Sequence, residues 1–99
     1  MIRIEIRKNS ITVKGHANQA EYGSDIVCAS VSTAVIMSVN QISLFNKAHC
    51  IERKVGMGDA SITVVSEDEI VSKVIDNLVF TLKDLELQYP KYIKINEKL

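Results

Sequence analysis

The chain has 99 residues, of which 46% are hydrophobic, and its 12 basic and 12 acidic residues cancel to a net charge of zero. This length and composition predict one domain over residues 1–99 with a hydrophobic core, and they exclude a disordered chain. The balanced charge predicts no direct binding to nucleic acid or to an anionic membrane. The N-terminus lacks a signal-peptide pattern, and no run of roughly 18 consecutive apolar residues occurs, so we expect a cytoplasmic protein that does not bind membranes.

The first part of the chain predicts a β-hairpin followed by a helix. Isoleucines at positions 2, 4 and 6 alternate with charged residues, and a polar turn separates them from a second extended segment at residues 11–14. This hairpin would place Gly15 and His16 at the end of its second strand. A small polar connection at residues 17–23 follows, and Ser24 or Asp25 is expected to cap the first helix. The buried face of that helix is predicted to contain Val27, Val31, Val35, Ile42 and Phe45, widened by Ala29, Ala34 and Ile36.

The second part predicts another hairpin and another helix. Residues 50–55 and 60–65 read as strands around a turn at 56–59, and Ser66 with Glu69 has the spacing of a capping box. The second helix is predicted to have Ile70, Val74, Leu78, Leu82 and Leu85 on one face, with Val71, Ile75 and Val79 beside it, and to end at Tyr89-Pro90. Residues 91–95 alternate again and form a possible edge strand. The predicted fold class is therefore α+β, with the order ββαββα(β) and a largely antiparallel sheet packed with two helices.

Cys28 and His16 together predict a cysteine nucleophile. Cys28 is expected in the first turn of the long helix, where the helix dipole and free backbone N–H groups favour a thiolate. His16 lies one loop upstream and could accept the thiol proton. The alternative for Cys28 is a small hydrophobic side chain packed inside a helix, since cysteine is among the most buried residue types. His16 by itself would be a strand-end histidine bonded to the backbone.

Two further residues near Cys28 could support such a site. Asp25 either caps the helix or pairs with an imidazolium, because a carboxylate acting on the thiol alone would raise the pKa of the thiol. Ser32 lies four residues after Cys28 and so on the same helix face. Its hydroxyl could bond to the helix carbonyl at Cys28, or it could orient water or substrate.

A zinc site is the main alternative on composition, since the chain has His16, Cys28, His49 and Cys50. The spacing disfavours it, because no paired C-x₂-C or H-x₃-H pattern occurs and adjacent strand residues such as His49 and Cys50 point to opposite faces. Cys50 is expected to be a buried strand residue and His49 a solvated loop residue. We expect free thiols, no metal and no cofactor.

The stretch from Gly15 to Ser32 resembles the signature of the ribosomal-processing cysteine protease family, Prp. The matching elements are Gly15-His16-Ala17, then Glu21-Tyr22-Gly23, then Asp25-Ile26-Val27-Cys28-Ala29, and finally Ser32. The resemblance extends along nearly the whole chain, through the region of Asn40 and the acidic start of the second helix, although only residues 15–32 are diagnostic. One departure is Ala20, where the family often has glycine.

The resemblance implies a specific function. Prp-like proteins remove an N-terminal extension from large-subunit ribosomal protein number twenty-seven, with the cysteine as nucleophile and the histidine as general base and acid. By that analogy these residues are Cys28 and His16, with Gly15, Asp25 and Ser32 in support. Family members are homodimers. The connecting loop, represented here by Ala17, Glu21, Tyr22 and Gly23, is thought to move to admit the peptide.

Two other classes of function remain open on the sequence. One is a noncatalytic ribosome-associated assembly or protein-binding factor in which Cys28 only packs. The other is an acyltransferase or redox sensor that uses the same activated thiol. Thiol reactivity at neutral pH would separate these two, and a new peptide N-terminus would identify a protease.

Overall fold

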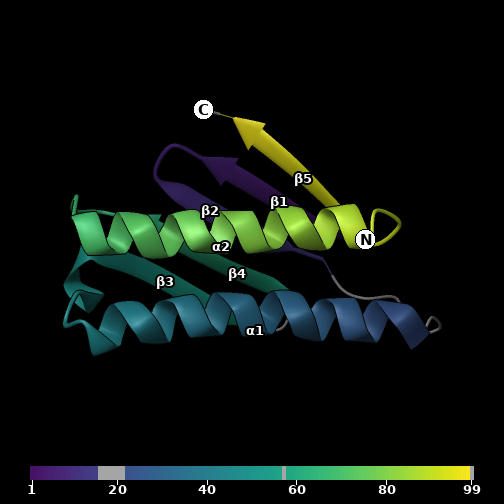
Figure 1. Ribbon diagram of the computed structural model, residues 1–99, viewed down its shortest axis with the longest axis horizontal. Coiled ribbons are helices and arrows are strands. Elements are labelled where there is room, and N and C mark those ends of the chain that lie inside the picture. Colours follow the sequence, from purple (N-terminus) through teal and green to yellow (C-terminus); the bar gives the residue numbers. More distant parts are fainter. Residues whose placement is uncertain (16–21, 57, 99) are drawn as a thin grey trace.

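The computed structural model describes residues 1–15, 22–56 and 58–98, and for residues 22–25 it describes the backbone alone. The predicted α+β fold is confirmed (Figure 1). The elements in chain order are β1 (Ile2–Arg7), β2 (Ser10–Lys14), α1 (Tyr22–Leu44), a short 3₁₀ helix η1 (Ala48–Cys50), β3 (Ile51–Gly56), β4 (Asp59–Val64), α2 (Glu69–Gln88) and β5 (Ile93–Lys98).

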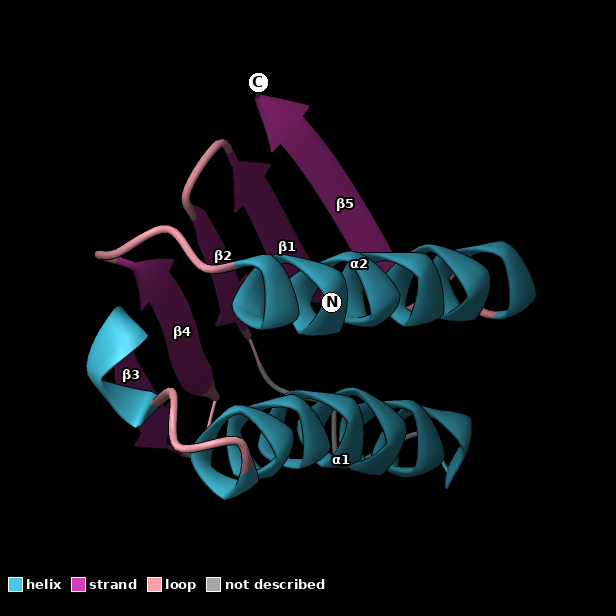
Figure 2. Cartoon of the chain, turned by 60° about the vertical axis from the view of Figure 1, so that its left-hand side comes forward, coloured by secondary structure: helices cyan, strands magenta, loops and turns pink. Residues whose placement is uncertain are grey.

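The strands form one sheet in the order β3-β4-β2-β1-β5. Three of the four strand pairings are antiparallel, and β5 runs parallel to β1. A parallel neighbour requires a crossover, which α2 provides. Both long helices lie on one face of the sheet, and β3 and β5 are its two edges (Figure 2).

The core lies between the sheet and the two helices. The alternation in β1 turns Ile2, Ile4 and Ile6 toward the helices, where all three are almost completely buried. α1 contributes five buried apolar side chains, at Val27, Val31, Val35, Val39 and Ile42, and α2 contributes Val71, Leu78 and Leu82. Helical spacing therefore predicted most of the buried face of α1 correctly.

The first helix differs from the prediction at both ends. It begins at Tyr22, so Ser24 and Asp25 lie inside its first turn and are not its N-cap. At the other end the helix stops at Leu44, and Phe45 is 54% exposed instead of buried.

Two other residues of α1 also differ from the prediction. Ala29 is exposed and Ile36 is 45% exposed. The buried positions in this part of the helix belong to Val39 and to Ser38, whose hydroxyl donates to the carbonyl of Ala34 at 2.9 Å.

The N-cap of α2 is Asp68, so the predicted capping box of Ser66 and Glu69 is wrong. The Asp68 carboxylate accepts hydrogen bonds from the backbone N–H groups of Ile70 at 2.9 Å and Val71 at 3.1 Å. An acidic side chain at this position also interacts favourably with the helix dipole. The buried residue of the first turn is Val71, whereas Ile70 is 37% exposed.

The C-terminal end of α2 agrees with the prediction. Tyr89 is its C-cap, and the Tyr89 N–H donates to the Leu85 carbonyl at 2.8 Å. The final strand also forms, as β5 at the edge of the sheet.

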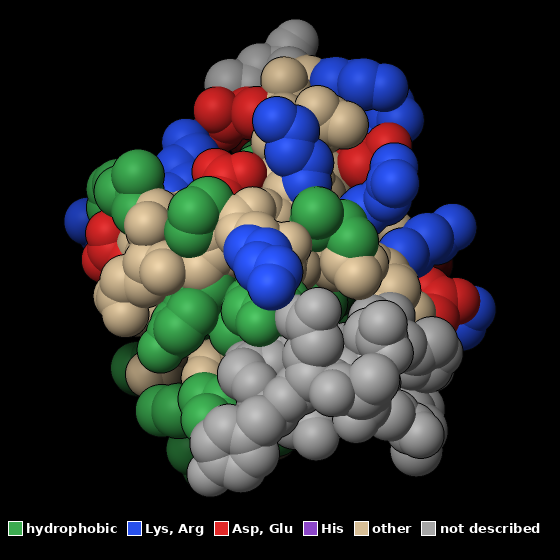
Figure 3. All heavy atoms as spheres, turned by 90° about the vertical axis from the view of Figure 1, so that its right-hand side faces the viewer, with side chains coloured by type: hydrophobic (Ala, Val, Ile, Leu, Met, Phe, Trp, Pro, Cys, Tyr) green, Lys and Arg blue, Asp and Glu red, His purple; other side chains and the backbone are tan. Residues whose placement is uncertain are grey.

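The two faces of the molecule differ in chemistry. Figure 3 views it from the end at which the helix layer lies to the left and the open face of the sheet to the right. Hydrophobic side chains gather over the helices, whereas Lys and Arg side chains gather over the sheet (Figure 3).

Residues Ile26–Leu44 of α1 are long and apolar enough to cross a membrane on length and composition alone. The core helix of a soluble protein can meet the same criteria, and α1 packs its valines on the sheet.

Candidate active site

A cavity of about 210 Å³ lies between the middle of α1 and the ends of four strands, β1, β2, β3 and β4. Cys28 and Ser32 line it from α1, so the structure brings together two of the predicted site residues. The rest of the wall is largely apolar. A third predicted residue, Gly15, directly follows the last residue of β2 and also lines the cavity. The full lining is Ile2, Val13, Gly15, Cys28, Val31, Ser32, Val35, Ile36, Val55, Gly56, Gly58, Asp59 and Ala60.

Gly15 is required by its backbone geometry. Its φ of +110° lies in a region that side chains rarely allow, and a Cβ atom there would overlap the carbonyl oxygen of Met1. The Gly15 N–H donates to the carbonyl of Gly58 at 3.0 Å. The residue that directly precedes His16 is thus fixed in the wall of the cavity that contains Cys28.

Cys28 lies six residues after the start of α1, which corrects the prediction that it occupies the first turn. The dipole effect falls off within the first turn, so the helix N-terminus gives the thiol less support than expected. Cys28 is a half-buried free thiol that packs against the hydrophobic core and also lines the cavity. Its position combines partial packing with access from the cavity.

Ser32 is exposed and faces the same cavity. Ser30 and Ser38 donate to the carbonyls of Ile26 and Ala34, four residues back. Within the residues described here, Ser32 makes no such bond to Cys28. Of the two roles predicted for Ser32, the structure leaves open the one in which its hydroxyl faces water or substrate.

The other predicted site residues fall wholly or partly outside the described residues. His16, Ala17 and Glu21 are among the residues that the structure leaves undescribed, and the side chain of Asp25 is undescribed as well. Tyr22 and Gly23 were predicted to belong to the connecting loop, but their backbone is the first part of α1. The prediction of a moving loop therefore stays a prediction.

The sequence did not predict that the β3–β4 hairpin forms a wall of this cavity. Val55, Gly56, Gly58 and Asp59 belong to it, and the Gly-x-Gly pattern indicated only a turn. Asp59 is the one charged residue among the described lining residues, and its carboxylate contacts Lys54 Nζ at 2.7 Å. The hydrogen bond from Lys54 lowers the pKa of Asp59 below its usual value, so this carboxylate is ionised at neutral pH and its charge is paired with that of Lys54.

The second cysteine is far from this chemistry. Cys50 is only 3% exposed, and its carbonyl accepts hydrogen bonds from the backbone N–H groups of Val65 and Ser66. It ends η1 instead of starting a strand, because the 3₁₀ turn precedes β3. His49 is exposed in the same turn. Among the residues that the structure describes, no three His, Cys, Asp or Glu side chains cluster as metal ligands.

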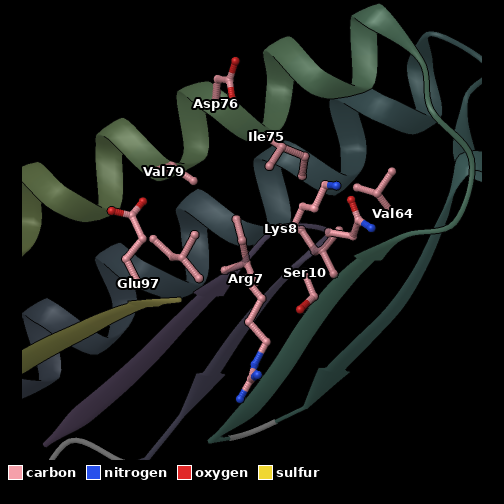
Figure 4. Close-up of a pocket in the computed structure, with 12 residues that line it drawn as sticks. Arg7, Lys8, Ser10, Val64, Ile75, Asp76, Val79 and Glu97 are labelled. Atoms are coloured by element: carbon pink, nitrogen blue, oxygen red, sulfur yellow. The ribbon is translucent and has the colours of Figure 1, made fainter. Parts of the chain in front are cut away.

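A second cavity, of about 230 Å³, lies at the opposite ends of β1, β2 and β4 (Figure 4). Lys8 of the β1–β2 turn and Ser10 of β2 border it, with Asp76 of α2 and Glu97 of β5 on the other side. Its lining has no cysteine or histidine. The cavity beside Cys28 is therefore the candidate active site.

Known proteins match this chain along its length. A family model described as cysteine protease Prp matches residues 1–94. A ribosomal processing cysteine protease Prp of Mycoplasma genitalium is 32% identical over 98 residues, which cover 99% of this chain and 97% of the relative. The protein of the same name from Staphylococcus aureus is 29% identical over 106 aligned positions, covering 99% of this chain and all of the relative.

A solved structure has the same fold. The crystal structure of an essential ribosomal processing protease Prp from S. aureus, in complex with a covalently linked product peptide, superimposes with a TM-score of 0.82 at 26% identity. The match covers 99% of this chain and 100% of that one. The five-stranded sheet and two helices described above are therefore an architecture shared with that protease.

Proposed function

The chain belongs to the cysteine protease Prp family, and we propose that it removes the N-terminal extension of large-subunit ribosomal protein number twenty-seven with a dyad of Cys28 and His16. Membership makes it a cysteine protease. The observation that carries the finer proposal is that Cys28 lines a largely apolar cavity that is also lined by Gly15, the residue directly before His16. The relatives named above are ribosomal processing proteases, which supports a processing reaction for this chain. The S. aureus protease has been crystallised with a covalently linked product peptide.

The proposed reaction has two chemical steps. His16 accepts the proton of the Cys28 thiol, and the thiolate attacks the scissile carbonyl carbon. The tetrahedral intermediate collapses to a thioester as His16 donates the proton to the leaving amine, which is the N-terminus of the mature ribosomal protein. Water, deprotonated by His16, then attacks the thioester, and the extension leaves with a free carboxylate while the thiol is regenerated.

Asp25 and Ser32 are proposed as supporting groups. Asp25 precedes Cys28 by three residues in α1, so the two positions share a helix face. A carboxylate there would stabilise the imidazolium that forms when His16 takes the proton. The Ser32 hydroxyl, on the same face one turn later, would orient substrate or the hydrolytic water.

The proposal includes a homodimer in the cytoplasm. Several large apolar side chains of the helix layer are exposed, among them Met37 at 57% and Phe80 at 68%. A surface of this kind over two helices is typical of a face that packs against another protein. Sedimentation should give a molar mass of about twice 11.0 kDa. A monomer at micromolar concentration would contradict this part of the proposal.

Cleavage of a synthetic peptide tests the function. The peptide contains the extension and the first residues of the mature ribosomal protein, and the new N-terminus is read by mass spectrometry. The wild-type protein should give one cut, whereas Cys28→Ala should give none. The alternative of a noncatalytic ribosome-associated factor predicts an uncut peptide in both reactions, and an acyltransferase would modify the peptide without cutting it.

A further inference from the structure

The sheet has two edges, and only one of them borders the cavity of Cys28. β3 forms this edge (Figures 1 and 2). Its last two residues, Val55 and Gly56, line the cavity. β5 forms the other edge, on the far side of the sheet from β3. An unpaired edge strand offers a row of backbone donors and acceptors to another extended chain.

The register shows which β3 groups are unpaired. The carbonyl of Cys50 accepts from the N–H of Val65, and Glu52 and Lys54 pair with Thr63 and Ser61 of β4. Since hydrogen-bonded and non-bonded pairs alternate along an antiparallel ladder, even-numbered residues of β3 bond to β4 and odd-numbered residues point outward. The Ile51 N–H is already bonded to the Ala48 carbonyl. The open N–H groups are therefore those of Arg53 and Val55.

The two edges are treated differently by their neighbours. At the β5 edge, Glu86 of α2 accepts a hydrogen bond from the Ile95 N–H at 2.7 Å, and Lys83 contacts Glu97 at 3.2 Å. Within residues 1–15, 22–56 and 58–98, no side chain bonds to a backbone group of β3. Side chains of α2 therefore contact the β5 edge, whereas in the described residues the β3 edge, which lies beside Cys28, has open backbone groups.

We propose that the substrate peptide pairs as an additional strand with the open edge of β3, through the backbone groups of Arg53 and Val55. This inference rests on the proposed function, and it names how the peptide is held. An extended peptide on this edge runs beside α1 and reaches the cavity where β3 ends, so that its scissile bond meets Cys28. Main-chain pairing of this kind supplies affinity, and the pockets beneath alternate side chains supply selectivity.

The side chains around this edge fit an apolar peptide. Val55 is 54% exposed and Ile36 of α1 is 45% exposed, and both line the cavity. An inward-facing apolar side chain of the peptide would cover them. Arg53 lies on the same face of β3 two residues earlier, and its charge makes the free edge a poor template for aggregation.

Amide hydrogen exchange measured by NMR tests the pairing. The Cys28→Ala protein is used with and without the extension peptide, so that the bound peptide stays intact. Peptide binding should slow exchange of the Arg53 and Val55 amides on the order of tenfold or more. The amides of Glu52 and Lys54 already face β4 and serve as internal controls that should not change. The Ile95 amide at the β5 edge is already bonded to Glu86 and is a further control whose exchange should not change.

The outcomes separate this inference from the proposed function. If the wild-type protein cuts the peptide but the Arg53 and Val55 amides keep their exchange rates in the Cys28→Ala complex, strand pairing at β3 is wrong and the protease assignment stands. Slowed exchange at the β5 edge instead would also overturn it. A peptide that is neither cut nor bound overturns both.

Discussion

The backbone N–H of Gly15 donates to the carbonyl oxygen of Gly58 across 3.0 Å. This bond joins the end of β2 to the tip of the β3–β4 hairpin, and both residues line the cavity that contains Cys28. His16 follows Gly15 directly in the chain, so its attachment point is fixed relative to the hairpin wall. The residue directly before the proposed base is thereby held against the hairpin whose β3 edge is proposed to bind the peptide.

The first prediction concerns Gly15 itself. Gly15→Ala should lower activity at least about tenfold and destabilise the fold by about 1–3 kcal/mol, because the residue has a positive φ and its Cβ would overlap the Met1 carbonyl. Gly56→Ala is the matched control, since its Cβ would approach the Asp59 carbonyl only to 3.3 Å. Peptide cleavage and thermal unfolding measure both effects. Equal behaviour of the two variants would refute the role given to Gly15.

The two thiols should differ in reactivity. Cys28 lines the cavity, whereas Cys50 is 3% exposed. Iodoacetamide at neutral pH should therefore modify native protein once, at Cys28, and should reach Cys50 only after unfolding. Peptide mapping identifies the site.

The Cys50→Ser variant, when folded, should keep most of the wild-type activity, because Cys50 does not line the cavity. Loss of cleavage in a folded Cys50→Ser protein would point to a second functional cysteine.

The ion pair between Lys47 and Asp68 should give a pH-dependent stability. Their charged atoms lie 2.8 Å apart, and the hydrogen bond between them lowers the pKa of Asp68 below 3.8 and raises the pKa of Lys47 above 10.5. The depressed pKa of Asp68 means that its contribution is complete above the ordinary value and is lost as pH falls through the folded pKa. The raised pKa of Lys47 means that its contribution is lost as pH rises through the folded value.

The comparison uses Asp68→Asn, which keeps an N-cap side chain but removes the charge. Its melting temperature should be a few degrees below that of the wild type between about pH 5 and 9, and the difference should narrow as pH falls through the depressed folded pKa of Asp68. A difference that does not narrow at all as the pH is lowered below 3.8 would show that the charge of Asp68 is not its cause.

Selectivity should exceed that of a general peptidase. Pairing along β3, together with apolar contacts at Val55 and Ile36, requires an extended segment with apolar side chains. An extension peptide that is apolar and contains aromatic residues should be cut, whereas unstructured casein should be cut at a negligible rate. Comparable rates on the two substrates, followed by gel electrophoresis and mass spectrometry, would leave only a general cysteine peptidase.

Local patterns in the sequence predicted most of the fold. Alternation in β1 and helical spacing in α1 and α2 place apolar side chains in the core. The strands and helices could therefore be recognised from the period of the hydrophobic pattern alone. The helix ends were harder to predict. Ser24, Asp25 and Ser66 are all capable caps, and Asp68, the cap of α2 in the structure, also pairs with Lys47, which is distant in sequence.

The part of the candidate site that depends on local helical spacing was also predictable from the sequence. Cys28 and Ser32 are one helical turn apart, so their shared face follows from the chain itself. The contribution of Val55, Gly56 and Asp59 depends on how β4 pairs with β2, which brings the hairpin next to Gly15. Pairings between distant segments leave no local signal. The order of strands, and with it the open edge at β3, had to come from the structure.

The central claim is that Cys28 is the nucleophile that removes the ribosomal extension. The most direct test is intact mass spectrometry of the full extended ribosomal protein after incubation with wild type, Cys28→Ala or His16→Ala. Wild type should release one N-terminal fragment, and rapid quenching should show that fragment bound to Cys28 as a thioester. Both variants should be slower by about a thousandfold or more while keeping melting temperatures within a few degrees of wild type. Cleavage by Cys28→Ala at the wild-type rate would contradict the account.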